Sequence, residues 1–156
     1  MICELEFAAE FSPNGTCLVG GGNPITIWDL NGERLRDFAD PSLPHQDSRG
    51  RSHLGSIESW AMAADGQQLV TVGGDSKVKV WDTETWKYER LPLRANVFCI
   101  DFAPEGDRII ASDMSGLTKL WDLQTRQVVA TYDGALAEFS PDGTLLAVGC
   151  RAIMGY

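Results

Sequence analysis

The sequence has few of the residues that metal and redox sites require. Its 156 residues include only two histidines, His45 and His53, too few for a histidine-rich metal site. The four cysteines form no CxxC pair, which argues against a zinc or redox motif and favours buried, reduced thiols. They are Cys3, Cys17, Cys99 and Cys150. No acidic cluster has the spacing of a calcium loop. We therefore expect no metal and no other cofactor.

Positive charge is also scarce. The chain has 13 Lys and Arg residues against 22 Asp and Glu residues, a formal net charge of −9. Such a chain repels a phosphate backbone unless its basic residues gather on one face, so nucleic acid is a poor candidate partner. The N-terminal MICELEFAAEF is acidic where a signal peptide is basic, and no apolar run approaches the roughly 18 residues of a membrane span. We expect a soluble, cytoplasmic protein that does not enter a membrane.

Internal repeats dominate what the sequence does contain. Three alternating segments close in Trp-Asp: ITIWD at 25–29, VKVWD at 78–82 and TKLWD at 118–122. A turn-like unit precedes each of them and occurs once more beyond the third: FSPNG at 11–15, MAADG at 62–66, FAPEG at 102–106 and FSPDG at 139–143. Pro presets φ and Gly accepts a positive φ, so these units predict tight turns between strands.

Placed in chain order, the pieces predict a four-stranded antiparallel meander that recurs about every 40 residues. This pattern is typical of the blades of a propeller, so we predict an all-β fold, a partial β-propeller built of four-stranded antiparallel blades. The expected single domain spans 1–156. Its parts are blade one at 4–38, a loop insertion at 39–56, blade two at 57–91, blade three at 97–132 and an incomplete blade four at 135–156.

Nearly all of the chain outside the insertion resembles the WD-repeat (Trp-Asp repeat) family of β-propellers. The resemblance implies a non-catalytic scaffold or adaptor whose partners are other proteins or peptides. It also implies a ring of about seven blades. A chain with about three and a half blades is then expected to be a fragment of a longer propeller, and self-association through exposed terminal blades is the alternative. Propellers attached to peptidases share the FSPDG unit, so an accessory propeller that gates or positions an enzyme's substrate is the alternative function.

The resemblance further implies a buried polar tetrad in blade two, formed by His53, Thr71, Asp75 and Trp81. In this tetrad Asp75 would accept a hydrogen bond from His53, and His53 would accept one from the Thr71 hydroxyl. Thr71 would in turn accept a hydrogen bond from the indole N–H of Trp81. A His, an Asp and a hydroxyl also make a nucleophilic triad. A catalytic hydroxyl, however, must reach substrate at an exposed turn, whereas Thr71 lies in mid-strand among apolar neighbours. We expect no catalytic residue.

The other blades lack this tetrad. In these blades the position of His53 is taken by Ile2, Leu93 and Ala130. The position of Thr71 is taken by Gly20, Ala111 and Val148. We therefore expect blades one, three and four to rely on apolar packing alone.

Four residues are candidate partner contacts. Trp86 and Tyr88 follow the third strand of blade two at a hairpin, where exposed aromatics mark binding surfaces, although a cross-strand pair is equally consistent. Arg49 and Arg51 lie in the insertion and would suit an acidic peptide or a phosphate, although a solvated surface loop explains them as well. Trp60 is expected to pack between blades.

Overall fold

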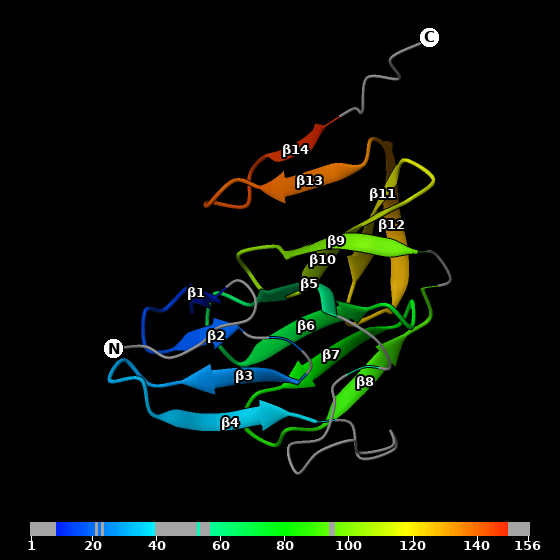
Figure 1. The fold of residues 1–156 in the computed structure, drawn as a ribbon. Coiled ribbons are helices and arrows are strands. Elements are labelled where there is room, and N and C mark those ends of the chain that lie inside the picture. Colours follow the sequence, from blue (N-terminus) through cyan, green and yellow to red (C-terminus); the bar gives the residue numbers. More distant parts are fainter. Residues whose placement is uncertain are drawn as a thin grey trace, which may run out of the picture.

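The computed structural model describes residues 9–20, 22, 24–39, 53, 57–93 and 96–149. These residues form 14 β-strands and no helix, so the predicted all-β class is confirmed. Accordingly, no helix in this part of the chain is long and apolar enough to cross a membrane. Figure 1 shows the strands as a series of small sheets that follow one another along the chain.

Three sheets have four strands and the last has two, and neighbouring strands are antiparallel throughout. The first sheet holds β1 (Ala9–Phe11), β2 (Leu18–Gly20), β3 (Ile25–Trp28) and β4 (Arg34–Phe38). The second holds β5 (Ile57–Met62), β6 (Gln68–Gly73), β7 (Val78–Asp82) and β8 (Tyr88–Leu91). The third holds β9 (Val97–Phe102), β10 (Arg108–Asp113), β11 (Leu117–Asp122) and β12 (Gln127–Asp133). The fourth holds β13 (Leu136–Phe139) and β14 (Leu146–Gly149). Each sheet is thus a meander, the predicted blade architecture, and the sheets are called blades one to four below.

The turn between the first two strands is the same in every blade. Its glycine adopts a positive φ and donates its amide to the carbonyl three residues earlier, which closes a tight turn. The glycines are Gly15 (φ 68°), Gly66 (74°), Gly106 (76°) and Gly143 (70°). The turns predicted from the PDG-like units therefore form, because glycine accepts this backbone conformation without steric cost.

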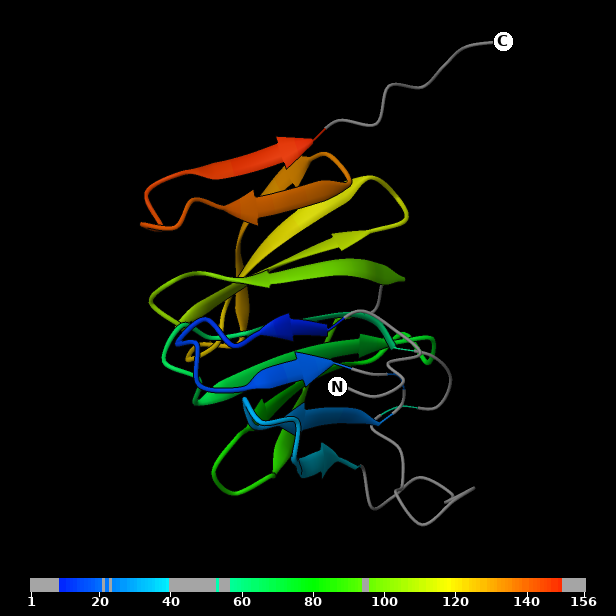
Figure 2. The same cartoon turned by 60° about the vertical axis from the view of Figure 1, so that its left-hand side comes forward.

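The blades pack face to face, as Figure 2 shows from the side. One apolar cluster joins blade one to blade two through Phe38 and Trp81, whose rings meet edge-on with centroids 5.5 Å apart. Trp60 packs against this cluster. A second cluster joins blade two to blade three through residues such as Val70 and Ile109. Because strand side chains alternate, blade two contributes Trp81 to one interface and Val70 to the other.

The first strands of the blades lie side by side and share polar contacts. The amide of Ile100 in β9 donates to Ser59 Oγ in β5 over 3.3 Å. The amide of Phe139 in β13 donates to Asp101 Oδ2 in β9 over 3.2 Å. Side-chain oxygens therefore bridge the backbones of successive blades at the inner edge of the stack.

Candidate functional site

The structure brings His53, Thr71, Asp75 and Trp81 into one hydrogen-bonded chain. His53 Nδ1 lies 2.9 Å from Asp75 Oδ1, and His53 Nε2 lies 2.7 Å from Thr71 Oγ1. The indole Nε1 of Trp81 donates to the same Thr71 oxygen over 2.9 Å. His53, Thr71 and Trp81 are each 0% exposed. Three of the four side chains proposed from the sequence are thus closed off from solvent, and that of Asp75 is 5% exposed.

The indole N–H of Trp81 can only donate, so Thr71 Oγ1 accepts from it. An imidazole protonated at Nδ1 completes the series, because Nδ1 then donates to Asp75 and Nε2 accepts from the Thr71 hydroxyl.

The surroundings of Thr71 explain why this group differs from a nucleophilic triad. Thr71 is paired with Trp60 on one side and Lys79 on the other, so it lies in the middle of the sheet. Its hydroxyl both donates and accepts within the tetrad and has no exposed surface. No position remains at which a substrate atom can approach this oxygen.

Gly73 is required for the tetrad, although sequence analysis did not single it out. A Cβ atom at Gly73 would lie 2.5 Å from both Cβ and Cγ of His53. The absence of a side chain at the end of β6 therefore makes the space that the imidazole fills.

Blade three lacks the tetrad, and its Trp-Asp tryptophan does not make the hydrogen bond that Trp81 donates to Thr71 in blade two. Ala111 occupies the position of Thr71, and the indole Nε1 of Trp121 is buried without a hydrogen-bond partner among the described residues. The expectation that blades one and three rely on apolar packing alone is nevertheless wrong. Ser112 and Thr118 share a 2.7 Å hydrogen bond in blade three, and in blade one Thr26 donates to Asp37 over 2.7 Å. Each of these bonds joins two neighbouring strands of one sheet. Their residues are not at the tetrad positions, so a comparison with blade two position by position does not reveal them.

The aspartate of each Trp-Asp pair organises the turn that follows it. Asp82 Oδ1 accepts from both the amide (2.6 Å) and the hydroxyl (2.8 Å) of Thr85, and Asp122 accepts from Thr125 over the same distances. The hydrogen bond from the Thr85 amide lowers the pKa of Asp82, and the Thr125 amide does the same for Asp122. Both aspartates therefore remain acceptors at neutral pH.

Trp86 lies half-buried between blades one and two, in contrast to its predicted exposure. Its ring centroid is 4.8 Å from that of Phe38, and the guanidinium of Arg36 lies 4.7 Å above the ring. The backbone explains the inward placement, because Trp86 has a φ of 62° and donates its amide to Asp82 over 2.9 Å. A left-handed conformation at a large side chain turns it back over the sheet.

A groove of about 320 Å³ adjoins this pair of side chains. Its lining comes from blades one and two: Asn14, Thr16, Cys17, Ile27, Leu35, Arg36, Met62, Gly66, Thr83 and Trp86. We call it the Arg36 groove. Arg36 is the one charged residue in this lining, so the groove combines apolar walls with a single cation.

Tyr88 forms the cross-strand pair that was the alternative to an exposed contact. It lies opposite Trp81 in the register, with ring centroids 4.8 Å apart. The ammonium of Lys79 lies 4.8 Å from the Tyr88 ring, and that lysine is completely buried. Sequence analysis missed Lys79, because lysine is rarely buried without a partner group.

The remaining candidate contacts, Arg49 and Arg51, lie outside the described residues, as does most of the 39–56 insertion.

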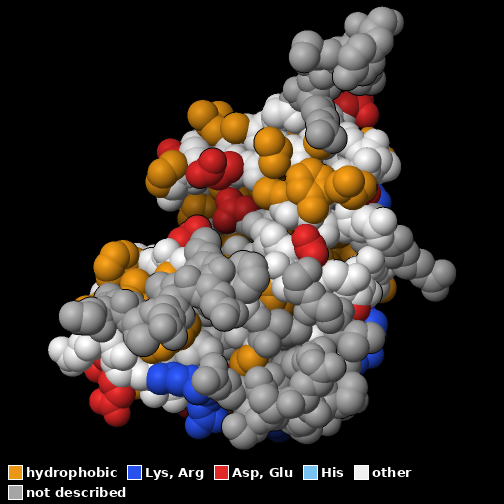
Figure 3. Space-filling model, viewed as in Figure 1, with side chains coloured by type: hydrophobic (Ala, Val, Ile, Leu, Met, Phe, Trp, Pro, Cys, Tyr) orange, Lys and Arg blue, Asp and Glu red, His pale blue; other side chains and the backbone are white. Residues whose placement is uncertain are grey.

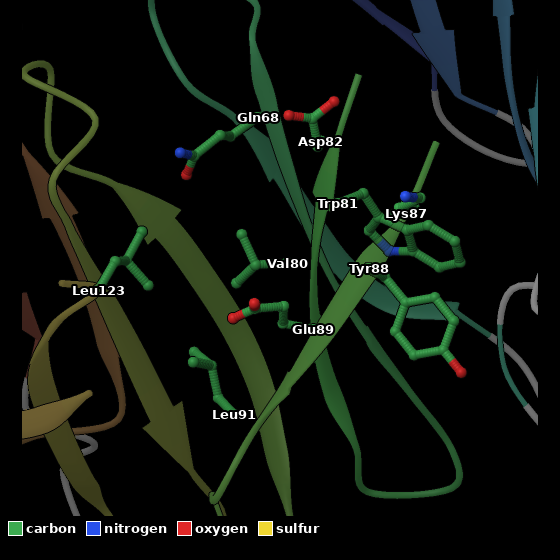
Figure 4. A pocket seen from close by; sticks show the side chains of 9 residues that line it. All are labelled: Gln68, Val80, Trp81, Asp82, Lys87, Tyr88, Glu89, Leu91 and Leu123. Carbon is green, nitrogen blue, oxygen red and sulfur yellow. The ribbon is translucent and has the colours of Figure 1, made fainter. Parts of the chain in front are cut away.

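A second groove, of about 310 Å³, lies beside β7 and β8 and reaches blade three. Figure 4 shows Val80 and Glu89 directed into this space, with Leu123 of blade three on the opposite side. Gln68 Oε1 is buried without a hydrogen-bond partner among the described residues. Arg126 of blade three forms an ion pair with Glu89, so charge at this groove is already compensated.

The fold and the tetrad together define part of a β-propeller. Comparison with known proteins gives the family: the WD40 model, described as WD domain, G-beta repeat, matches residues 48–82 and 91–122. The first stretch contains His53, Thr71, Asp75 and Trp81, and the second contains Trp121. Blades two and three therefore carry WD repeats, and the chain is similar to proteins of the WD-repeat family.

Similar proteins include three of different kinds. Echinoderm microtubule-associated protein-like 1 of Rattus norvegicus is 27% identical over 161 residues, covering 92% of this chain and 18% of the relative. Meiotic recombination protein rec14 of Schizosaccharomyces pombe is 26% identical over 149 residues, covering 91% and 46%. Guanine nucleotide-binding protein subunit beta-1 of Caenorhabditis briggsae is 32% identical over 79 residues, covering 49% and 23%. The chain therefore spans less than half the length of each of these relatives.

Proposed function

We propose that this chain is a non-catalytic scaffold that binds other proteins in the cytoplasm. Two of the relatives are, by their names, components of protein assemblies: one is microtubule-associated and one is a subunit of a guanine nucleotide-binding protein. We also propose that blades one to four correspond to residues 4–38, 57–91, 97–132 and 135–156, with an insertion at 39–56. In this proposal the tetrad of blade two is structural, and partners bind at surfaces between and around the blades.

The observation that carries this proposal is the contrast between the polar cluster and the grooves. The one His, Asp and hydroxyl cluster among the described residues is closed to solvent, with the Thr71 hydroxyl engaged in both directions. The open features are two grooves lined by residues of neighbouring blades, in which apolar side chains lie beside a few polar and charged ones. Such surfaces suit recognition of a peptide or protein.

Affinity capture tests the proposal. The folded chain, a variant without residues 39–52 and a heat-unfolded sample would be immobilised in parallel and exposed to extracts of the cells that make the protein. A scaffold should recover the same proteins repeatedly and in a saturable way, and the unfolded sample should not. The intact mass of each recovered partner should stay unchanged after incubation with the chain. Recovery no greater than that of the unfolded sample, or a chemical change in the partner, would contradict the proposal.

A further inference from the structure

Arg36 differs in its ionic contacts from two other surface arginines. Arg34 pairs with Asp37, and Arg126 pairs with Glu89. Arg36 forms no ion pair among the described residues, and its guanidinium rests on the face of Trp86. An arginine stacked on an aromatic ring keeps the N–H groups at its edge available, and those groups match the two oxygens of a carboxylate.

The platform under Arg36 is fixed by the protein itself. The turn that carries Trp86 is held by hydrogen bonds from Thr85 to Asp82 and by the left-handed backbone of Trp86. The Trp86 ring also packs on Phe38 of blade one. A binding partner therefore meets a preorganised cation and does not have to order it, which lowers the cost of association.

The rest of the groove offers apolar surface and little competing polarity. Thr83 already donates to the carbonyl of Gly66 over 2.7 Å, and Thr16 donates to Asn14 over 2.7 Å. The walls are aliphatic, and they include Leu35, which is 56% exposed at the rim. No carboxylate lines the groove among the described residues. The charge at this site is thus positive and uncompensated, in a chain whose net charge is −9.

Figure 3 shows Lys and Arg side chains over the lower half of the molecule, where carboxylates also lie beside them, and further carboxylates over the upper half. β4, the strand that carries Arg36, lies in the lower part of this view.

We propose that the Arg36 groove binds an acidic segment of a partner protein. The carboxylate of an Asp or Glu pairs with Arg36, and an adjacent aliphatic side chain enters the space between Leu35 and Met62. A volume of about 320 Å³ is at the lower end of ligand pockets and suits one or two side chains of a peptide. This inference rests on the proposed function, since it names the chemistry of a partner for the same scaffold.

The test begins with random peptides displayed on phage and selected on the folded chain. The selected peptides, labelled with fluorescein, are then titrated by anisotropy against the wild type, Arg36→Gln, Arg36→Lys and Arg90→Gln. Arg90 is the matched control, because its guanidinium also rests on an aromatic ring, that of Tyr88 at 5.7 Å, outside the groove. Circular dichroism and thermal melts confirm that each variant is folded.

The proposal expects peptides that contain Asp or Glu next to Leu, Ile, Val or Met. Arg36→Gln should weaken their binding about tenfold or more, Arg36→Lys should weaken it several-fold, and Arg90→Gln should leave it within about twofold. Added salt should weaken binding to the wild type. Bound peptide should also protect Cys17, which lines the groove, from alkylation, while Cys99, which is absent from its lining, reacts as before.

Several outcomes would overturn the inference. These are selected peptides without acidic residues, equal affinity for Arg36→Gln and the wild type, unchanged alkylation of Cys17, or binding only when the peptide carries a phosphate. A failure to select any peptide would count against the groove as well. None of these results removes the scaffold function, which affinity capture tests separately. Captured partners that bind Arg36→Gln normally would leave the scaffold intact and place its contact elsewhere.

Discussion

Replacing His53 with alanine should destabilise blade two more than most single substitutions do. The change deletes a side chain that is 0% exposed, together with its hydrogen bonds to Thr71 (2.7 Å) and to Asp75 (2.9 Å). The two former partners stay in the interior, since the Asp75 side chain is only 5% exposed. The alanine cannot fill the space over Gly73 that the imidazole occupies.

The magnitude follows from what each partner retains. Thr71 still accepts from Trp81, and Asp75 still accepts from the amide of Lys77 over 3.2 Å. Thr71 and Asp75 therefore each lose one hydrogen bond and keep another. An unsatisfied buried polar group costs roughly 1–3 kcal/mol of stability, and each of these two losses lies near the lower end of that range. The cavity left by the ring adds about 1 kcal/mol or more. We expect His53→Ala to lower the free energy of unfolding by about 3–4 kcal/mol.

Urea denaturation followed by circular dichroism and tryptophan fluorescence measures this change, and hydrogen exchange of the β6 and β7 amides localises it to blade two. Thr71→Val provides the matched control, because it removes the hydroxyl and keeps the shape. The double variant should cost less than the sum of the single ones, since both changes break the same His53–Thr71 bond. A loss below about 1 kcal/mol for His53→Ala, or full additivity, would refute the tetrad as a stabilising unit.

Three further predictions follow from other positions. Ala111→Ser should supply a hydrogen-bond acceptor to the indole of Trp121, which has no partner among the described residues, and raise the free energy of unfolding by about 0.5–1.5 kcal/mol. Thermal melts measure this gain, and the same substitution in a Trp121→Phe background should give none. Burial raises the pKa of Asp101, so the folded state holds this proton more tightly than the unfolded chain does. The wild type should therefore gain stability relative to Asp101→Asn as the pH falls from neutral to about 4, and a pH-independent difference in melting temperature would contradict this. Gly66→Ala should destabilise the chain by about 1 kcal/mol or more, because φ is 74° and the new Cβ would lie 2.7 Å from Asn14 Nδ2; Asn14→Ala should relieve the clash component in denaturation experiments.

The parts of the structure that repeat were predictable from the sequence. A PDG-like unit specifies its turn locally through Pro and Gly, and a Trp-Asp strand specifies its alternation locally as well. Four copies of the turn signal and three of the Trp-Asp strand are enough to predict the order of the strands and the blade architecture. The tetrad was within reach for a similar reason: His53, Thr71, Asp75 and Trp81 all belong to one repeat and match one family pattern.

The contacts between blades were not predictable in this way. The Arg36–Trp86 stack joins residues of different repeats, so it depends on how two sheets pack, which no local pattern encodes. Trp86 was expected at the surface because the positive φ that turns it inward is rare for a large residue and leaves no signature in TETWKYE. Lys79 was overlooked because its ammonium lies over the rings of Trp81 and Tyr88, a placement that the local sequence does not encode. In each case the missing information is the position of an aromatic neighbour.

The tetrad and the Arg36 groove are physically connected. Trp81, held by Thr71, packs edge-on against Phe38 of blade one, and Phe38 in turn packs against Trp86 beneath Arg36. Loosening the tetrad should therefore shift the platform on which the arginine rests, and variants of His53 should weaken both stability and peptide binding. Substitution of Arg36 removes an exposed cation at the end of this series and should weaken binding alone. Thermal melts and peptide titrations on the His53 and Arg36 variants distinguish these effects. The tetrad and Arg36 lie at opposite ends of the same packed series of rings, so a change in the tetrad affects both measurements and a change of Arg36 affects binding alone.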